Sequence, residues 1–137
     1  MKKLILGLFL FSSTIMAGSI TINVTDIANQ NGKLFIGLYN KDDDTFASTS
    51  KCYKVVNLFM ESNETRYTFK NISNGIYAIA IFHDENGNKE LDTNIFGIPS
   101  EGYGFSNNIR PKFRPASFEE AKFVLDDNIS VTIKIGY

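Results

Sequence analysis

Ser19-Ile20-Thr21-Ile22-Asn23-Val24-Thr25 alternates strictly between apolar and polar side chains. A period of two places the isoleucines and the valine on one face, which is typical of a β-strand with one wet face. The same alternation returns over residues 129–135, close to the end of the chain. These two stretches predict strands that each turn one face to a core and the other to water.

Other segments between these two stretches also have the composition of strands. Residues 34–39 and 76–82 are apolar on both faces, which indicates strands buried on both sides. Two further strands are predicted at residues 53–60 and 67–70. The segment 76–82 is expected to be a central strand of its sheet.

Turn and helix signals complete the predicted fold. Asn31-Gly32 is a strong hairpin signal, and Asn74-Gly75 predicts another turn. Ser117 and Glu120 have the spacing of a capping box, which predicts one or two helical turns through Ala121. The pattern therefore predicts an all-β fold: an antiparallel, immunoglobulin-like β-sandwich of about seven strands, rather than a barrel or an α/β fold, with at most a short helix.

The segment from residue 83 to about residue 113 is dominated by Asp, Asn, Gly, Ser and Pro. A loop of this length inside a compact domain is usually functional or disordered. Its isolated apolar residues argue for order, because they can fasten the loop to the body of the domain. The residues expected to do so are Ile95, Phe96, Ile98, Tyr103 and Phe105.

The first 17 residues have the composition of a secretory signal peptide. Lys2 and Lys3 precede the apolar run 4–11, and small residues follow up to Ala17. The run is shorter than the roughly 20 residues that span a bilayer, which disfavours a retained anchor. No cysteine follows it, which disfavours a lipoprotein. We therefore expect an exported protein, periplasmic or secreted, with residues 1–17 removed and residues 18–137 forming a single domain.

The charge balance narrows the class of partner. Without Lys2 and Lys3 the chain has 12 basic and 15 acidic residues, a net charge of −3. A nucleic-acid partner usually requires a basic face, so none is expected. No second long apolar segment occurs, so no membrane span is expected after signal removal. The partner is expected to be a protein or a small molecule, and the oligomeric state stays open.

One loop has the spacing of a calcium site. Oxygen-bearing side chains fall at alternate positions, as in the Asp-x-Asn-x-Asn loops of bacterial surface domains. The candidate ligands are Asp84, Asn86, Asn88, Glu90 (through its carbonyl) and Asp92. The loop departs from the EF-hand pattern, because Gly87 comes fourth and Ile95 stands where a bidentate Glu belongs. The alternative is a tight turn, because Asp, Asn and Gly also favour turns.

Five other positions each allow a functional or a structural role: Glu101, Tyr103, Phe105, His83 and Cys52. Glu101 could fold back to complete the calcium shell, and Tyr103 and Phe105 could present aromatic rings to a ligand or cover the edge of the core. His83, the only histidine, could be a base or metal ligand, but a strand-end residue that bonds the loop backbone is the favoured interpretation. Cys52, the only cysteine, is expected at a half-buried strand position as a structurally inert thiol.

Asn63 and Asn128 each lie in the pattern acid-x-Asn-x-Ser/Thr, an extended bacterial N-glycosylation signal. Both occur where turns are expected, so both sites could be accessible. Whether either asparagine carries a glycan stays open.

The segment Gly97-Ile98-Pro99-Ser100-Glu101-Gly102-Tyr103-Gly104-Phe105, together with residues 73–79, 83–88 and 91–94, closely resembles a family of exported bacterial proteins, domain of unknown function family 2141. The resemblance covers essentially the whole mature chain and is most specific over residues 75–108. It implies an exported β-sandwich with a prealbumin-like arrangement. It implies no activity and no binding residues.

Two functional hypotheses follow. The first is a non-enzymatic binding module with a calcium-stabilised loop. The second is a small-ligand carrier or an enzyme that uses residues 83–108 as a pocket wall. Turnover or a retained ligand in the purified protein would favour the second hypothesis, and metal content without either would favour the first.

Overall fold

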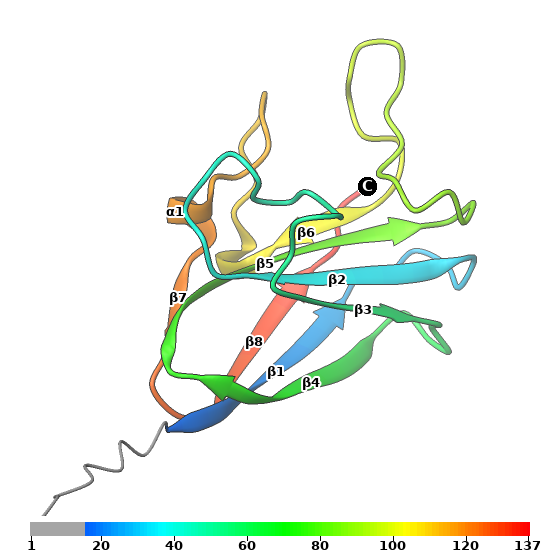
Figure 1. Ribbon diagram of the computed structural model, residues 1–137. Coiled ribbons are helices and arrows are strands. Elements are labelled where there is room, and N and C mark those ends of the chain that lie inside the picture. The colour runs from blue at the N-terminus through cyan, green and yellow to red at the C-terminus, as the bar shows by residue number, and fades with distance from the viewer. Residues whose placement is uncertain (1–15) are drawn as a thin grey trace, which may run out of the picture.

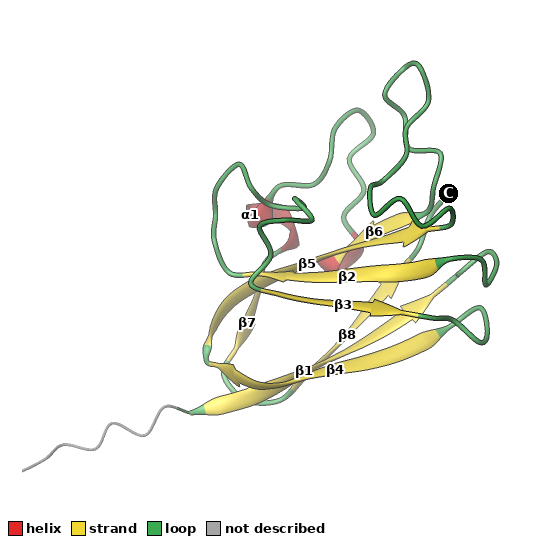
Figure 2. Cartoon of the chain, turned by 45° about the vertical axis from the view of Figure 1, so that its right-hand side comes forward, coloured by secondary structure: helices red, strands yellow, loops and turns green. Residues whose placement is uncertain are grey.

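The computed structural model describes residues 16–137, which form two β-sheets that face each other (Figure 1, Figure 2). The smaller sheet has the order β4–β1–β8, with the bounds Thr65–Ser73, Ala17–Thr25 and Ile129–Lys134. The larger sheet has the order β3–β2–β5–β6, with the bounds Lys54–Leu58, Lys33–Tyr39, Gly75–Asp84 and Tyr103–Phe105. A further strand, β7 (Phe123–Leu125), pairs with the first residues of β5. The predicted β-sandwich is therefore confirmed.

All strand pairs but one are antiparallel. The exception joins β1 to β8, which run parallel from the pair Ile20 and Ile129 to the pair Thr25 and Lys134. The two sheets come together at one edge, where the backbones of Tyr103 and Gly136 exchange two hydrogen bonds of 3.0 Å. Gly104 is required there, because a Cβ at this position would lie 2.7 Å from the carbonyl oxygen of Lys134.

The core between the sheets is built by the alternation in β1. Ile20, Ile22 and Val24 have no exposed surface, and they pack against residues of the larger sheet such as Ile36 and Ile79. The polar residues of β1 lie on the opposite face, where Thr21 hydrogen-bonds Thr68 across the strands. The predicted one-sided burial of residues 19–25 is thus confirmed.

Strands β2 and β5 are buried on both faces, as their uninterrupted apolar sequence predicts. One face of β5 enters the core between the sheets, and the other is covered by a second cluster outside the larger sheet. The second cluster contains Tyr39, Ala78, Ala80, Phe105, Ala116, Phe118 and Ala121. It includes the short helix α1 (Phe118–Ala121), which begins at the predicted capping box of Ser117 and Glu120.

Some boundaries differ from the predicted ones. The third strand, β3, covers only Lys54–Leu58, and the fourth extends over Thr65–Ser73. Cys52 is half-buried but precedes β3, so its predicted strand position is wrong. Its Sγ points to the Thr49 carbonyl at 3.6 Å, and burial raises its pKa. β3 lies at a sheet edge, where its residues are partly exposed. The strand is therefore shorter than the apolar stretch 53–60 predicts.

The long segment after β5 is ordered, but not by all of the expected residues. It contains β6 and the short 3₁₀-helix η1 (Ser106–Asn108), and Phe105 packs in the second cluster. Ile95, Phe96 and Ile98 are instead exposed, so the prediction that they fasten the loop to the body is wrong. Hydrogen bonds to buried carboxylates hold the loop instead, as described below.

Most of the predicted signal peptide, residues 1–17, lies outside the described residues. Within residues 16–137, no helix is both long and apolar enough to cross a membrane. Asn63 and Asn128 are both exposed, and the Oδ1 of Asn128 accepts hydrogen bonds from the backbone and hydroxyl of Ser19.

Ser106 connects three elements and gives a test of the packing. Its buried hydroxyl accepts a 2.9 Å hydrogen bond from the Ile79 amide and donates to the Ala121 carbonyl. Ser106→Ala leaves the Ile79 amide unpaired, so we expect a loss of about 1–3 kcal/mol of unfolding free energy in urea titrations. Ser100→Ala, at an exposed serine, should change stability by less than about 0.5 kcal/mol. Equal stability of the two variants would contradict this role.

Candidate functional site

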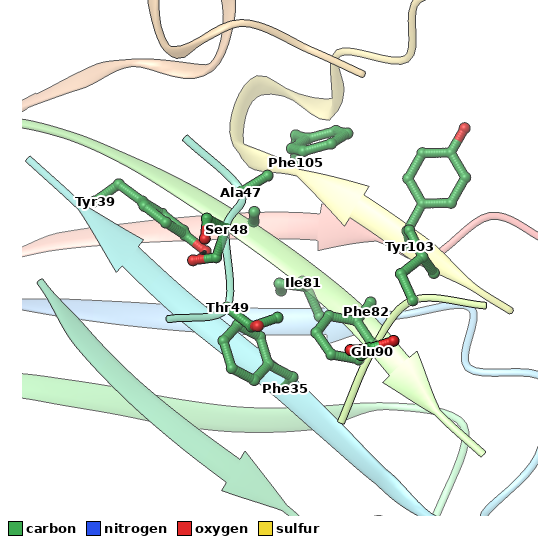
Figure 3. Close-up of a pocket in the computed structure, with 12 residues that line it drawn as sticks. Phe35, Tyr39, Ala47, Ser48, Thr49, Ile81, Phe82, Glu90, Tyr103 and Phe105 are labelled. Carbon is green, nitrogen blue, oxygen red and sulfur yellow. Dashed lines mark hydrogen bonds between the residues drawn. The ribbon is translucent and has the colours of Figure 1, made fainter. Parts of the chain in front are cut away.

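A hollow of about 280 Å³ lies on the outer face of the larger sheet (Figure 3). Its floor is formed by side chains of β2 and β5, and β6 supplies one side. The segment 47–49 and the segment 90–91 form the remaining walls. The hollow therefore gathers residues from five parts of the chain that are far apart in sequence.

The floor of the hollow is aromatic. Phe35 and Phe82 are opposite each other in the β2–β5 pairing, and their rings stack with centroids 4.8 Å apart. Both rings are directed to the outer face because each strand places alternate side chains on opposite sides of the sheet. Phe105 and Tyr103 of β6 add two further rings, which contact each other edge to face. Stacked and edge-on rings give a rigid apolar surface.

The segment 47–49 is fixed by hydrogen bonding and aromatic packing. The Tyr39 hydroxyl donates a 3.1 Å hydrogen bond to the Ser48 carbonyl, and Phe46 packs edge-on against the Tyr39 ring at 5.2 Å. Burial, together with nearby Cys52, raises the pKa of Tyr39 well above its ordinary value. Tyr39 therefore stays protonated and keeps donating this hydrogen bond at any physiological pH.

The opposite wall carries the one charged group that lines the hollow. Glu90 is exposed, and its side chain lies beside Phe82 in Figure 3. Thr49 and Ser48 supply hydroxyl groups from the other side. The hollow thus combines an apolar floor with a small number of polar groups at its rim, which is the usual composition of a small-molecule site.

The predicted calcium loop adjoins this wall, and hydrogen bonds between side chains link three of its five residues, Asn86, Asn88 and Asp92, to one another. The Asp84 carboxylate accepts from the amides of Gly87, at 2.8 Å, and Lys89, at 3.0 Å. The side-chain amides of Asn86 and Asn88 both donate to the carboxylate of Asp92. The fifth residue, Glu90, has its side chain at the hollow.

The side-chain oxygens of Asn86 and Asn88 are occupied by the backbone. Each accepts a 3.0 Å hydrogen bond from the amide two residues ahead, Asn88 and Glu90 respectively. Such bonds are the usual way in which asparagine stabilises a tight turn. In residues 16–137, no three His, Cys, Asp or Glu side chains are grouped closely enough to hold a metal ion.

Glu101 closes the base of this loop. It is almost fully buried, and its Oε1 accepts a 2.9 Å hydrogen bond from the Glu85 amide while its Oε2 accepts a 3.1 Å hydrogen bond from the Asp92 amide. Both oxygens are therefore used on backbone donors. Of the three predicted binding-loop residues, Tyr103 and Phe105 line the hollow and Glu101 supports its wall.

His83 has a structural position, and its interpretation as a strand-end residue that bonds a loop backbone is confirmed. The ring has no exposed surface, and its Nε2 lies 2.6 Å from the Asn31 carbonyl oxygen. A carbonyl only accepts, so Nε2 carries the proton. Nδ1 lies 2.6 Å from the Tyr137 hydroxyl, which in turn accepts from the Ala28 amide. The imidazole therefore connects β5 to the β1–β2 turn and to Tyr137.

A family model matches residues 22–133, which is most of the chain, and it is described as an uncharacterized protein conserved in bacteria (DUF2141). The chain belongs to this family. The resemblance noted for the segment 75–108 is thereby confirmed. No curated protein and no solved structure matches the DUF2141 chain.

The floor of the DUF2141 hollow is not among the residues predicted from the sequence. The apolar pattern predicts for Phe35, Tyr39 and Phe82 only that their strands are buried on both sides, and it does not indicate what covers their outer face. Their size could have indicated the hollow. Three large aromatic side chains on one face of a sheet need other segments packed over them, and the short predicted helix is too small to cover all three. The position of residues 47–49 as a wall of the hollow could not be predicted from the sequence, because it depends on tertiary packing.

Glu101→Gln tests whether the buried carboxylate holds the loop. An amide can accept only one of the two backbone hydrogen bonds and sets its own N–H groups against the other donor. We expect a loss of about 1–3 kcal/mol in unfolding free energy and faster proteolytic cleavage within residues 85–100. Glu61→Gln, at an exposed glutamate, is the control and should change neither property. An unchanged cleavage rate in Glu101→Gln would show that the loop is held by other contacts.

Proposed function

We propose that this protein is an exported, non-enzymatic binding module that holds a small molecule in the aromatic hollow. The observation that carries this proposal is the stacked pair Phe35 and Phe82, which forms the floor of the hollow between two loops. This combines both sequence-based hypotheses, because residues 83–108 supply part of the pocket wall. Export is supported by the composition of residues 1–17.

The dimensions and chemistry of the hollow define the ligand. A volume of about 280 Å³ is near the lower end of the roughly 300–1,000 Å³ of small-molecule pockets, so one or two rings would fill it. A flat apolar face would stack on the floor, where aromatic contacts are most favourable. Polar groups at the ligand edge would face the hydroxyls of Ser48 and Thr49 and the carboxylate of Glu90.

Binding can be tested with 6-propionyl-2-dimethylaminonaphthalene, a neutral two-ring dye whose emission rises in apolar sites. The wild-type protein should enhance the emission in a saturable manner. Ala80→Leu adds bulk to the β5 side of the hollow and should weaken binding by about tenfold or more, since the lost apolar contact costs more than about 1.4 kcal/mol.

Ala28→Leu is the matched control, because it makes the same substitution at an exposed alanine outside the hollow and should bind like the wild type. Thr49→Leu fills the hollow from the opposite wall. It provides a second test of the hollow if Ala80→Leu does not fold. Binding that is unaffected by either filling variant would place the dye elsewhere and exclude this hollow as the site.

We also propose that calcium stabilises the loop of residues 84–92. The supporting observation is that Asn86 and Asn88 converge on the Asp92 carboxylate, so three of the predicted ligand side chains face one another. Residues 84–101 hold five carboxylates and a single cation, Lys89, which leaves an excess of negative charge. Calcium binding would turn the two amide oxygens toward Asp92 and offset this repulsion.

Thermal melts in chelator and in millimolar calcium test this proposal. If calcium is present at about 100 times its dissociation constant, the native state gains roughly 2.7 kcal/mol. The melting temperature should then rise by about 5–15 °C, and most of the rise should be lost in Asp92→Asn. Asp26→Asn, at an exposed aspartate outside the loop, is the control. Identical wild-type melts in both conditions would show that the loop is only a turn.

A further inference from the structure

The segment 92–100 forms a hairpin that projects beyond the sheets. Thr93 and Pro99 form a bridge, and the Asn94 amide donates a 2.8 Å hydrogen bond to the Ile98 carbonyl. The side-chain oxygen of Asn94 accepts from the amides of Phe96 and Ile98, and Gly97 takes the positive φ of +74° that the turn requires. The hairpin is therefore an ordered structure and presents its side chains in a defined way.

The tip of this hairpin is apolar and exposed. Ile95 is 93% exposed, Phe96 80% and Ile98 59%. Residues 93–100 carry no charge. Large apolar side chains gathered on an ordered protrusion mark an interaction site, because nothing in the fold of the domain requires their exposure.

A second apolar tip projects in the same direction. Phe113 is 91% exposed, and it lies in the segment 109–116, which contains Arg110, Lys112 and Arg114 and no acidic residue. The Lys112 ammonium lies 5.5 Å from the centre of the Phe113 ring. Both figures show the segments 92–100 and 109–116, which precede and follow β6, rising on the same side of the larger sheet (Figure 1, Figure 2).

The acidic side chains next to the first tip are engaged elsewhere. Glu101 and Asp84 accept hydrogen bonds from the backbone at the base of the loop, and Asp92 accepts from Asn86 and Asn88. Glu90 is at the hollow. The projecting parts on this side therefore present apolar groups on one loop and, on the other, Phe113 beside the Lys112 ammonium, while Arg114 is paired with the Glu120 carboxylate.

We propose that this side of the molecule docks on an anionic lipid surface, with both tips inserted at the level of the head groups. A flat and deformable surface meets two separated protrusions at the same time. The basic side chain beside the second tip matches the phosphate groups of anionic lipids, whose attraction adds to that of the apolar residues. The proposed docking does not require a ligand in the hollow.

The absence of tryptophan from the sequence permits a direct test with single-tryptophan variants. Phe96→Trp places the reporter in the first tip, and Phe59→Trp places it at an equally accessible phenylalanine, 74% exposed, beyond the end of β3. The probes are vesicles of phosphatidylcholine alone and vesicles in which about one third of it is replaced by phosphatidylglycerol. On the anionic vesicles, Phe96→Trp emission should move to shorter wavelength and that of Phe59→Trp should not.

Sedimentation with the same vesicles measures affinity. Phe96→Ser and Phe113→Ser should each weaken the binding by about tenfold, because each removes a phenyl ring that insertion into the lipid surface would bury. Lys112→Gln should weaken it by about fivefold and reduce its dependence on salt. Phe59→Ser should bind like the wild type.

Three results would overturn the proposal. One is a lack of sedimentation with the anionic vesicles. Another is equal binding to the two kinds of vesicle, which would remove the role of the cations. The third is a concentration-dependent shift of Phe96→Trp emission without vesicles, which would show that the tip is a contact between copies of the protein.

Discussion

Strand β5 must bury both of its faces, because its apolar residues alternate with other apolar residues rather than with polar ones. The smaller sheet covers one face with the side chains of β1, and this forms the core that any sandwich needs. The other face needs a separate cover, and the chain supplies it from α1, β6 and the segment that follows β2. This second cover is incomplete, and the candidate hollow is the part of the outer face that it leaves open.

Beside this hollow, buried carboxylates accept backbone hydrogen bonds that strands or helices would otherwise satisfy. Asp84 and Glu101 accept four backbone hydrogen bonds between them, all from amides of the loop that follows β5. Hydrogen bonds to charged acceptors are stronger than neutral ones, so two side chains can hold a segment that has almost no strand or helix. The loop can therefore present residues such as Glu90 and Phe96 in fixed positions without a core of its own.

The parts of the fold that local chemistry determines could be predicted from the sequence. Alternation in residues 19–25 and 129–135 and the Ser117 capping box depend on neighbours a few residues away. The hairpin expected at Asn31-Gly32 is wrong, because this turn joins β1 to β2, which lie in different sheets. The turn at Asn74-Gly75 likewise joins strands of different sheets, β4 and β5. The short strands β6 and β7 could not be predicted, because three residues carry no period and only their partner β5 makes them strands. Ile95, Phe96 and Ile98 were misassigned because an apolar residue is normally inside, and only their position on a projecting hairpin shows otherwise. The hollow depends on which segments meet over β5, so only its aromatic members had a signal in the sequence.

The parallel pairing of β1 with β8 has a consequence for how the chain reaches its native state. Ser19 bonds Asn128 across 109 residues, so the smaller sheet is incomplete until nearly the whole chain is available. A fold dominated by contacts of such long sequence separation forms slowly, because the entropy of closing the chain is lost before the contact is gained. The N-terminal strand of such a protein has only one of its two partners while the chain is still being made. For a protein that is proposed to be exported, this delay matters, because a secretion channel for unfolded polypeptides accepts a chain that is still extended.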